Sequence, residues 1–316
     1  MSNLKTSIIN IITKSLGLKS GEKFFIVADK RTEQLAKMFL KEAMSITQNV
    51  EIGLVKISLS GQEPPGEIAE KMKMSDVVVM LTTSSYTHTK ARIEANASGA
   101  RIASMPNVNE DIIIRAGNAD YEMIAKKTSK LGKILDRGSL VLIKTKAGTN
   151  LELNISGRKS LLCTGLLQRP GSIGNIPGGE TFIAPIEGSA NGNLVVDGSV
   201  AGIGKVRDTI NISIVEGYAK SIDGGREADL LKARLDKFGK DAYAVSELGI
   251  GTNNTALLSG HVVEDEKVVG TAHIVLGKNV SFGGKIDVPI HIDLVFLKPT
   301  ITVDDILVID NGKFLI

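Results

Sequence analysis

The chain has 316 residues, of which 42% are hydrophobic and 23% charged, a globular composition long enough for two domains that each bury a core. Its 38 Lys and Arg against 35 Asp and Glu give a formal net charge of +3 without a basic run, and with no Trp and four Tyr it is not expected to bind nucleic acid. We expect a cytoplasmic protein, because Cys163 is the only cysteine and the N-terminus has no secretory pattern. We expect no membrane role, because no apolar run approaches the roughly 20 residues that span a bilayer.

Helix-like and strand-like segments alternate in the first part of the chain. We expect helices at about 8–16, 31–45, 68–73 and 118–135, and strands at 24–28, 50–57 and 77–81. Short apolar runs such as Phe24 to Ala28 are typical of parallel strands buried between helices. The order predicts an N-terminal α/β domain of the sandwich type with a parallel sheet, over residues 1–136. Ligands gather beyond the C-terminal ends of such strands, where Thr87-His88-Thr89 follows the third one.

After Gly138 the sequence pattern changes to short runs of alternating apolar and polar residues, separated by Gly, Asn and Asp. Candidate strands are 140–143, 151–155, 194–196, 210–214 and 262–263. This pattern predicts a mainly antiparallel, barrel-like β domain over residues 137–316.

Three of the four histidines, His261, His273 and His291, lie in this second part. In the order Ile290-His291-Ile292-Asp293-Leu294 polar and apolar residues alternate, so on a strand His291 and Asp293 share one face. Mixed nitrogen and oxygen ligands suit zinc, cobalt, manganese or iron. The alternative is a hydrogen-bonded pair on a solvated strand face. His273 interrupts a small and apolar run, where it is either a ligand or a satisfied core histidine.

Two carboxylates have similar surroundings. Glu180 follows Pro177-Gly178-Gly179, and Glu247 lies within the glycine-rich run Ser246 to Asn253. A carboxylate flanked by apolar residues and glycines is costly to bury unless it is paired or ligated. The alternative for each is an exposed turn residue. The charged run Glu264 to Lys267 is expected to be a solvated turn, from which one carboxylate could reach a metal.

The segment Gly178-Gly179-Glu180-Thr181-Phe182-Ile183-Ala184-Pro185, followed by Glu187 to Gly192, resembles the signature of the thermophilic metallo-aminopeptidases, the aminopeptidase T and S group. The ligand order of that family also matches Glu180, Glu247, His273, His291 and Asp293. The resemblance implies a homodimeric hydrolase with two divalent ions (Zn, Co or Mn) that activates water to remove N-terminal residues from peptides. It assigns these five residues to the metals, gives Glu247 a further role as catalytic base, and makes Glu266 the acidic ligand before His273, offset by about two residues.

One departure from that family concerns a tyrosine that usually follows the first ligand histidine by seven residues. This chain has Val280 there, and His88 is the catalytic group that could replace it. An alternative is an Fe(II)-dependent ring-cleaving enzyme similar to dihydroxypyridine dioxygenase, in which His273, His291 and Asp293 alone hold one iron and Glu180 and Glu247 lie beside it. A third hypothesis is a non-catalytic metal-binding relative.

Overall fold

The computed structural model describes residues 3–56 and 61–316, so Ile57, the last residue of the strand predicted at 50–57, lies outside the described residues. The chain divides into two compact units, one formed by residues 1–125 and 164–178 and the other by residues 126–163 and 179–316. The first unit therefore takes a short second stretch of chain, whereas the sequence suggested one boundary at residues 136 and 137. Within the two described ranges, no helix has the length and apolar character needed to cross a membrane.

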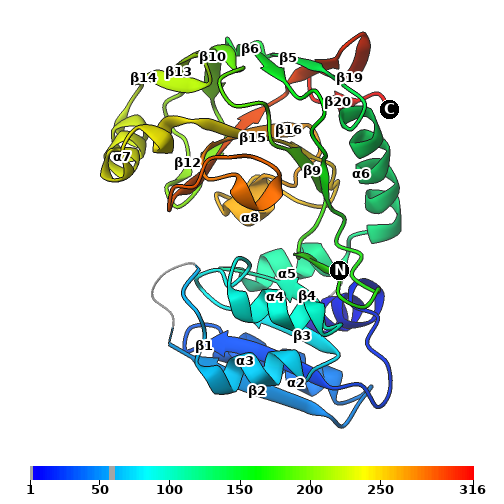
Figure 1. Ribbon diagram of the computed structural model, residues 1–316. Coiled ribbons are helices and arrows are strands. Elements are labelled where there is room, and N and C mark those ends of the chain that lie inside the picture. Colours follow the sequence, from blue (N-terminus) through cyan, green and yellow to red (C-terminus); the bar gives the residue numbers. More distant parts are fainter. Residues whose placement is uncertain (1–2, 57–60) are drawn as a thin grey trace. The chain divides into compact units, whose positions relative to one another are not determined.

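The first unit contains a parallel sheet of five strands in the order β2-β1-β3-β4-β8 (Figure 1). Its strands are β1 (Phe24–Asp29), β2 (Val50–Val55), β3 (Val77–Leu81), β4 (Arg101–Ser104) and β8 (Ile173–Asn175). Every residue of β1, β3 and β4 is buried, as central parallel strands require. Strand β8 comes from the returning stretch and pairs in parallel with β4. The predicted parallel α/β domain is confirmed.

Helices alternate with these strands. They are α1 (Leu4–Asn10), the π-helical turn η1 (Ile11–Ser15), α2 (Glu33–Ala43), α3 (Gly66–Lys73), α4 (Lys90–Ala97) and α5 (Glu110–Gly117), while α6 (Tyr121–Leu135) begins in the first unit and ends in the second. Among them, α4 and α5 were not expected from the sequence. Thr89 is the N-cap of α4, and its side chain accepts a hydrogen bond from the backbone N–H of Arg92. The Thr87-His88-Thr89 motif thus has a structural role as a helix start.

The second unit contains two antiparallel sheets. The larger has the order β14-β13-β10-β6-β5-β18-β19-β20. Its strands are β5 (Leu140–Lys144), β6 (Asn150–Asn154), β10 (Asn191–Val196), β13 (Ile210–Val215), β14 (Tyr218–Asp223), β18 (Thr300–Val303), β19 (Ile306–Asp310) and β20 (Lys313–Phe314). In β5 only Val141 and Ile143 are buried, which is the alternation expected of a strand with one face on the core.

The smaller antiparallel sheet has the order β12-β11-β17-β16-β15-β9-β7. Its strands are β7 (Leu161–Cys163), β9 (Glu180–Ile183), β11 (Ser199–Val200), β12 (Gly204–Lys205), β15 (Val245–Gly251), β16 (Thr271–Gly277) and β17 (His291–Leu297). Leu248, Ile274 and Leu294, which pair across its central strands, belong to one buried apolar cluster with Val141 and Ile212 of the larger sheet. The predicted antiparallel β domain is confirmed.

Short helices complete the second unit: α7 (Arg226–Leu235), α8 (Val262–Asp265), and the 3-10 turns η2 (Asp236–Phe238), η3 (Lys240–Tyr243) and η4 (Val280–Phe282). The strand expected at 262–263 is wrong, because these residues begin α8. The expectation of a solvated turn at 264–267 is also wrong. Asp265 is buried and accepts hydrogen bonds from the backbone N–H groups of Ser259 at 2.6 Å and Gly260 at 3.0 Å, which supply the polar contacts that its burial requires.

Candidate metal centre

Four adjacent strands of the smaller sheet, β9, β15, β16 and β17, bring the predicted ligands to one face. The residues are Glu180 on β9, Glu247 on β15, His273 on β16, and His291 and Asp293 on β17. Val275 lies between Glu247 and Asp293 in the register, and His273 is two residues before Val275 on the same strand. Side chains opposite one another across strands, and those two apart along a strand, share a face. The opposite face packs into the apolar core.

A glycine directly opposite His273 leaves space for its ring. Gly249 pairs with His273 in the register, and a Cβ atom at Gly249 would lie 2.0 Å from Cε1 and 2.1 Å from Nε2 of the imidazole. Because atoms cannot approach so closely, only glycine fits at this position while the ring keeps its place. The glycine at position 249 of β15 therefore follows from the close packing of the candidate site.

The Nε2 atom of His273 lies among three carboxylates. It is 3.4 Å from Glu247 Oε1, 3.8 Å from Glu180 Oε2 and 4.0 Å from Asp293 Oδ1. The Nε2 atom of His291 is 3.8 Å from Asp293 Oδ1 and 3.9 Å from Glu247 Oε2. These distances exceed those of good hydrogen bonds, whereas two ligand atoms that each lie about 2.1 Å from one ion are roughly 3 to 3.5 Å apart. The spacing is close to that of atoms around a shared cation.

The ring of His291 is held in the orientation that a metal ligand needs. Its Nδ1 atom is 3.0 Å from the backbone carbonyl oxygen of Lys278, which can only accept a hydrogen bond. Nδ1 therefore carries the proton, and the lone pair of the neutral ring is on Nε2, the atom near Glu247 and Asp293.

Two buried polar atoms in the cluster lack a hydrogen-bond partner among the residues that the structure describes. They are Oε2 of Glu180 and Nδ1 of His273. A buried polar group without a partner costs about 1–3 kcal/mol, and more if it is charged. A cation beside Glu180 Oε2 would remove that cost. The residues present therefore fit a divalent metal ion in donor chemistry, spacing and unsatisfied oxygen.

The cluster contains more acidic groups than cationic ones. Burial raises the pKa of Glu180 to about 7 and that of Glu247 to about 7, and burial together with nearby Glu266 raises the pKa of Asp293 well above its usual range. Lys267 is fully buried among them; burial favours its neutral form, but the carboxylates of Glu180 and Glu266 outweigh this and raise its pKa. The cluster thus contains one ammonium group and four carboxyl groups, those of Glu180, Glu247, Glu266 and Asp293. A divalent ion could supply the missing positive charge.

Lys267 is the residue of this cluster that the sequence reasoning missed. Its Nζ atom is 2.6 Å from Glu180 Oε1 and also donates to Glu266 Oε1. Glu266, expected as a ligand, is indeed brought to the cluster, where Glu180, Glu266 and His273 form one group with metal-ligand spacing and Glu247, His273 and Asp293 form another. The sequence held no local signal for it, because the charged run Glu264 to Lys267 is typical of a solvated turn and Glu180, the distant partner of Lys267, lies on β9.

Two further positions singled out from the sequence belong to other elements. His88 belongs to the first unit, in the loop before α4, and its catalytic role stays a prediction. Val280 is the first residue of η4 and is 46% exposed. A hydroxyl group of the kind that the aminopeptidase family places there is missing from this side chain.

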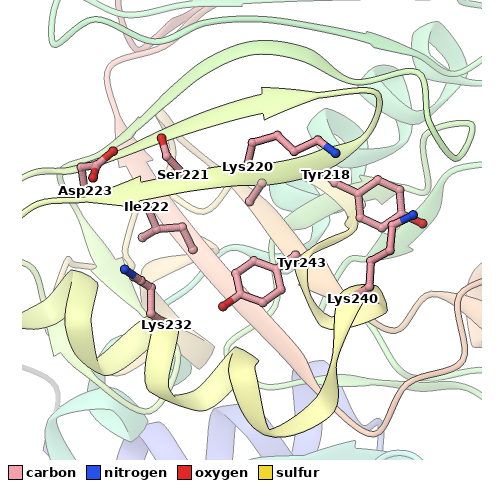
Figure 2. A pocket seen from close by; sticks show the side chains of 9 residues that line it. Tyr218, Lys220, Ser221, Ile222, Asp223, Lys232, Lys240 and Tyr243 are labelled. Carbon is pink, nitrogen blue, oxygen red and sulfur yellow. The ribbon is translucent and has the colours of Figure 1, made fainter.

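A surface cavity of about 410 Å³ lies over β14, α7 and η3, and none of the metal-cluster residues lines it. Figure 2 shows Lys240 beside the ring of Tyr218, with the ammonium 4.7 Å from the ring centre. The hydroxyl of Tyr243 donates to Asp236 Oδ1 at 2.5 Å, and burial together with this carboxylate raises its pKa to about 12. The cavity therefore lacks the metal donors of the cluster.

Comparison with known proteins identifies the family. Residues 17–316 match the family model NicX: 2,5-dihydroxypyridine 5,6-dioxygenase. The chain is 25% identical over 197 residues to the 2,5-dihydroxypyridine 5,6-dioxygenase of Pseudomonas putida KT2440, an alignment that spans 57% of this chain and about half, 55%, of that relative.

Two solved structures share the fold. The 2,5-dihydroxypyridine dioxygenase structure from Pseudomonas putida KT2440 has a TM-score of 0.86 and 18% identity, covering 100% of this chain and 98% of that one. Wild-type AmpT from Thermus thermophilus has a TM-score of 0.73 and 14% identity, covering 99% of each chain. The resemblance to the aminopeptidase T group is thus confirmed as a likeness of fold.

The predicted activity is wrong. A metallo-aminopeptidase, hydrolase or protease is contradicted by the family match over residues 17–316 and by the curated relative, both of which name a dioxygenase. The physical reason for the error is that the dioxygenase and AmpT structures both share the fold of this chain, and a fold does not determine the reaction. The difference at Val280 agrees with the correction.

Proposed function

Because this chain belongs to the NicX family of 2,5-dihydroxypyridine 5,6-dioxygenases, we propose that it is a metal-dependent dioxygenase that opens the ring of a dihydroxylated pyridine. The observation that carries the proposal is the convergence of His273, His291 and Asp293 on one face of the smaller sheet. Two histidines and one carboxylate are the ligand set of many non-haem Fe(II) oxygenases. This is the alternative reading of the sequence, in which the metal is one Fe(II).

His273, His291 and Asp293 would hold the iron, and Glu247 lies in contact with both histidines. When bound, Fe(II) supplies the one-electron chemistry that allows O2 to react with a closed-shell organic ring. A dioxygenase places both atoms of O2 in its product, so the ring and O2 together balance the reaction and an external reductant is not needed.

The chain's own residues also provide an apolar wall for a flat ring. Phe282 packs edge-on against His291, with ring centres 6.1 Å apart, and edge-on against Phe182 at 5.6 Å. Asn279 holds the loop that carries Phe282, since its side chain donates to the carbonyl of Ser246 and accepts from the N–H of Ile286. We assign this wall to binding of the aromatic substrate beside the metal.

Glu247 is the second candidate for a chemical role. Its carboxylate lies 3.4 Å from His273 Nε2 and 3.9 Å from His291 Nε2, so it faces the metal ligands. We assign Glu247 Oε2 to accept the proton that a ring hydroxyl loses when it approaches the cation. The base role expected from the sequence is thus retained for a different reaction.

The test is O2 consumption by protein reconstituted with Fe(II) under anaerobic conditions and mixed with 2,5-dihydroxypyridine. We expect uptake by the wild type and by Asp305→Asn, an exposed control. We expect at least a hundredfold lower rate for Asp293→Asn and His291→Ala. Wild-type rates in both ligand variants, or no uptake by the wild type, would contradict the proposal. The homodimer and the cytoplasmic location expected from the sequence are kept as proposals, and sedimentation tests the former.

A further inference from the structure

Lys267 is a buried cation inside a cluster of metal-ligand type. Its side chain is fully buried, and its Nζ atom contacts Glu180 Oε1 at 2.6 Å and Glu266 Oε1. Its backbone N–H donates to the carbonyl of Glu264, and its carbonyl accepts from Asn253, so the backbone at this position is anchored on both sides. The ammonium is therefore held in place by the chain itself.

The two carboxylates that bind Lys267 form one of the two donor groups. Glu180, Glu266 and His273 make the first group, and Glu247, His273 and Asp293 make the second. Both groups include His273, whose Nε2 atom has one lone pair and can bind one ion, so only one group can hold an ion with this histidine and the carboxylates of the other need a different cation. Only the second group is free of Lys267, and His291 lies beside this second group.

We propose that the ammonium of Lys267 takes the place of a second metal ion, so that this donor set holds one divalent ion, bound by His273, His291 and Asp293 with Glu247 beside them. A second divalent ion at Glu180 and Glu266 would lie against the ammonium and would have to expel it. Charge repulsion and competition for the same oxygen atoms both oppose this. Lys267 is a positioning residue, since it binds one oxygen atom of Glu180 and one of Glu266 and so fixes both carboxylates beside the bound ion.

The inference rests on the proposed function only in requiring that a divalent metal binds. The unpaired Oε2 atom of Glu180, which is buried and lies 3.8 Å from His273 Nε2, supports it independently. This oxygen faces His273 and the bound ion, whereas its sister oxygen is bound by Lys267. Removal of the ammonium should therefore free oxygen atoms of Glu180 and Glu266 to bind a second ion.

The experiment counts Co²⁺ ions bound per chain, by titration calorimetry and by elemental analysis after gel filtration. We expect one ion in the wild type, one in Lys267→Arg, which keeps the charge, and one in the exposed control Lys220→Ala. Lys267→Ala should bind two. It should also have a lower melting temperature than the wild type without metal and regain much of the loss with Co²⁺, because unpaired buried carboxylates are destabilising.

Two ions in the wild type, or a folded Lys267→Ala that binds one ion with unchanged affinity, would overturn the proposal. If Lys267→Ala does not fold even with Co²⁺, the proposal is tested by measuring the Co²⁺ affinity of two variants that keep Lys267. Asp293→Asn should then lower Co²⁺ affinity at least tenfold more than Glu180→Gln, and equal losses would refute the assignment. One bound ion in a protein that shows no O2 uptake would refute the proposed activity and leave this inference standing.

Discussion

Replacing Gly249 with Ala tests the packing argument for the metal centre most sharply. The added Cβ would lie 2.0 Å from Cε1 of His273, and an ordinary contact begins at 3.4 Å, so the ring must move by about 1.4 Å. Metal coordination tolerates errors of about 0.2 Å in ligand distance. We therefore expect Gly249→Ala to lower Co²⁺ affinity at least a hundredfold, about 2.7 kcal/mol. Overpacking should also lower the free energy of unfolding by about 1–3 kcal/mol.

Gly66→Ala is the matched control, because Gly66 has no neighbouring atom within 4 Å of an added Cβ and does not have a positive φ. Calorimetric titration with Co²⁺ gives the affinity, and urea unfolding without metal gives the stability. The control should match the wild type in affinity. Wild-type metal affinity in Gly249→Ala would show that His273 is not a ligand in the position described.

Three further predictions concern substrate, charge and metal. Phe282→Leu should raise the KM for 2,5-dihydroxypyridine several-fold and change kcat less, because it removes an aromatic contact of the binding wall; an unchanged KM argues against that wall. Burial raises the pKa of Glu22, but hydrogen bonds from Arg101 outweigh this and lower it. Ionised Glu22 therefore stabilises the fold at pH values above its usual pKa of 4.5, and this contribution is lost as the pH falls through the pKa of the folded state. Glu22→Gln should therefore cost about 1–2 kcal/mol in urea unfolding at pH 7 and little at pH 3, and an equal cost at both would refute the pairing. Removal of metal by a chelator should lower the melting temperature, and Co²⁺ at 100 times its Kd should restore about 2.7 kcal/mol; no response would indicate that the cluster binds no metal.

The sequence pattern was sufficient for strand β17, which carries two of the site residues. The alternation around His291 and Asp293 correctly indicated one shared face, because a strand has a period of two. The run Val77 to Leu81 was recognised as a buried strand from its continuous apolar character. These elements are predictable because each is determined by a local pattern that its neighbours reinforce.

The parts that were not predicted depend on contacts between distant segments. Strand β8 has three residues, one of them glycine, and it is a strand because β4 pairs with it. Asp265 and Lys267 are buried because their partners come from other segments, namely the 259–260 loop and Glu180, which no local pattern indicates. The activity was missed for a different reason, since the dioxygenase and AmpT structures share one fold and the fold does not determine the reaction.

The most direct measurement of the central claim is the fate of ¹⁸O2 in the reaction of the Fe(II)-loaded protein with 2,5-dihydroxypyridine, followed by mass spectrometry of the ring-opened product. A dioxygenase that uses His273, His291 and Asp293 predicts two ¹⁸O atoms per product molecule and one O2 consumed per ring. An intact ring without O2 uptake, together with hydrolysis of an aminoacyl anilide, would contradict the account.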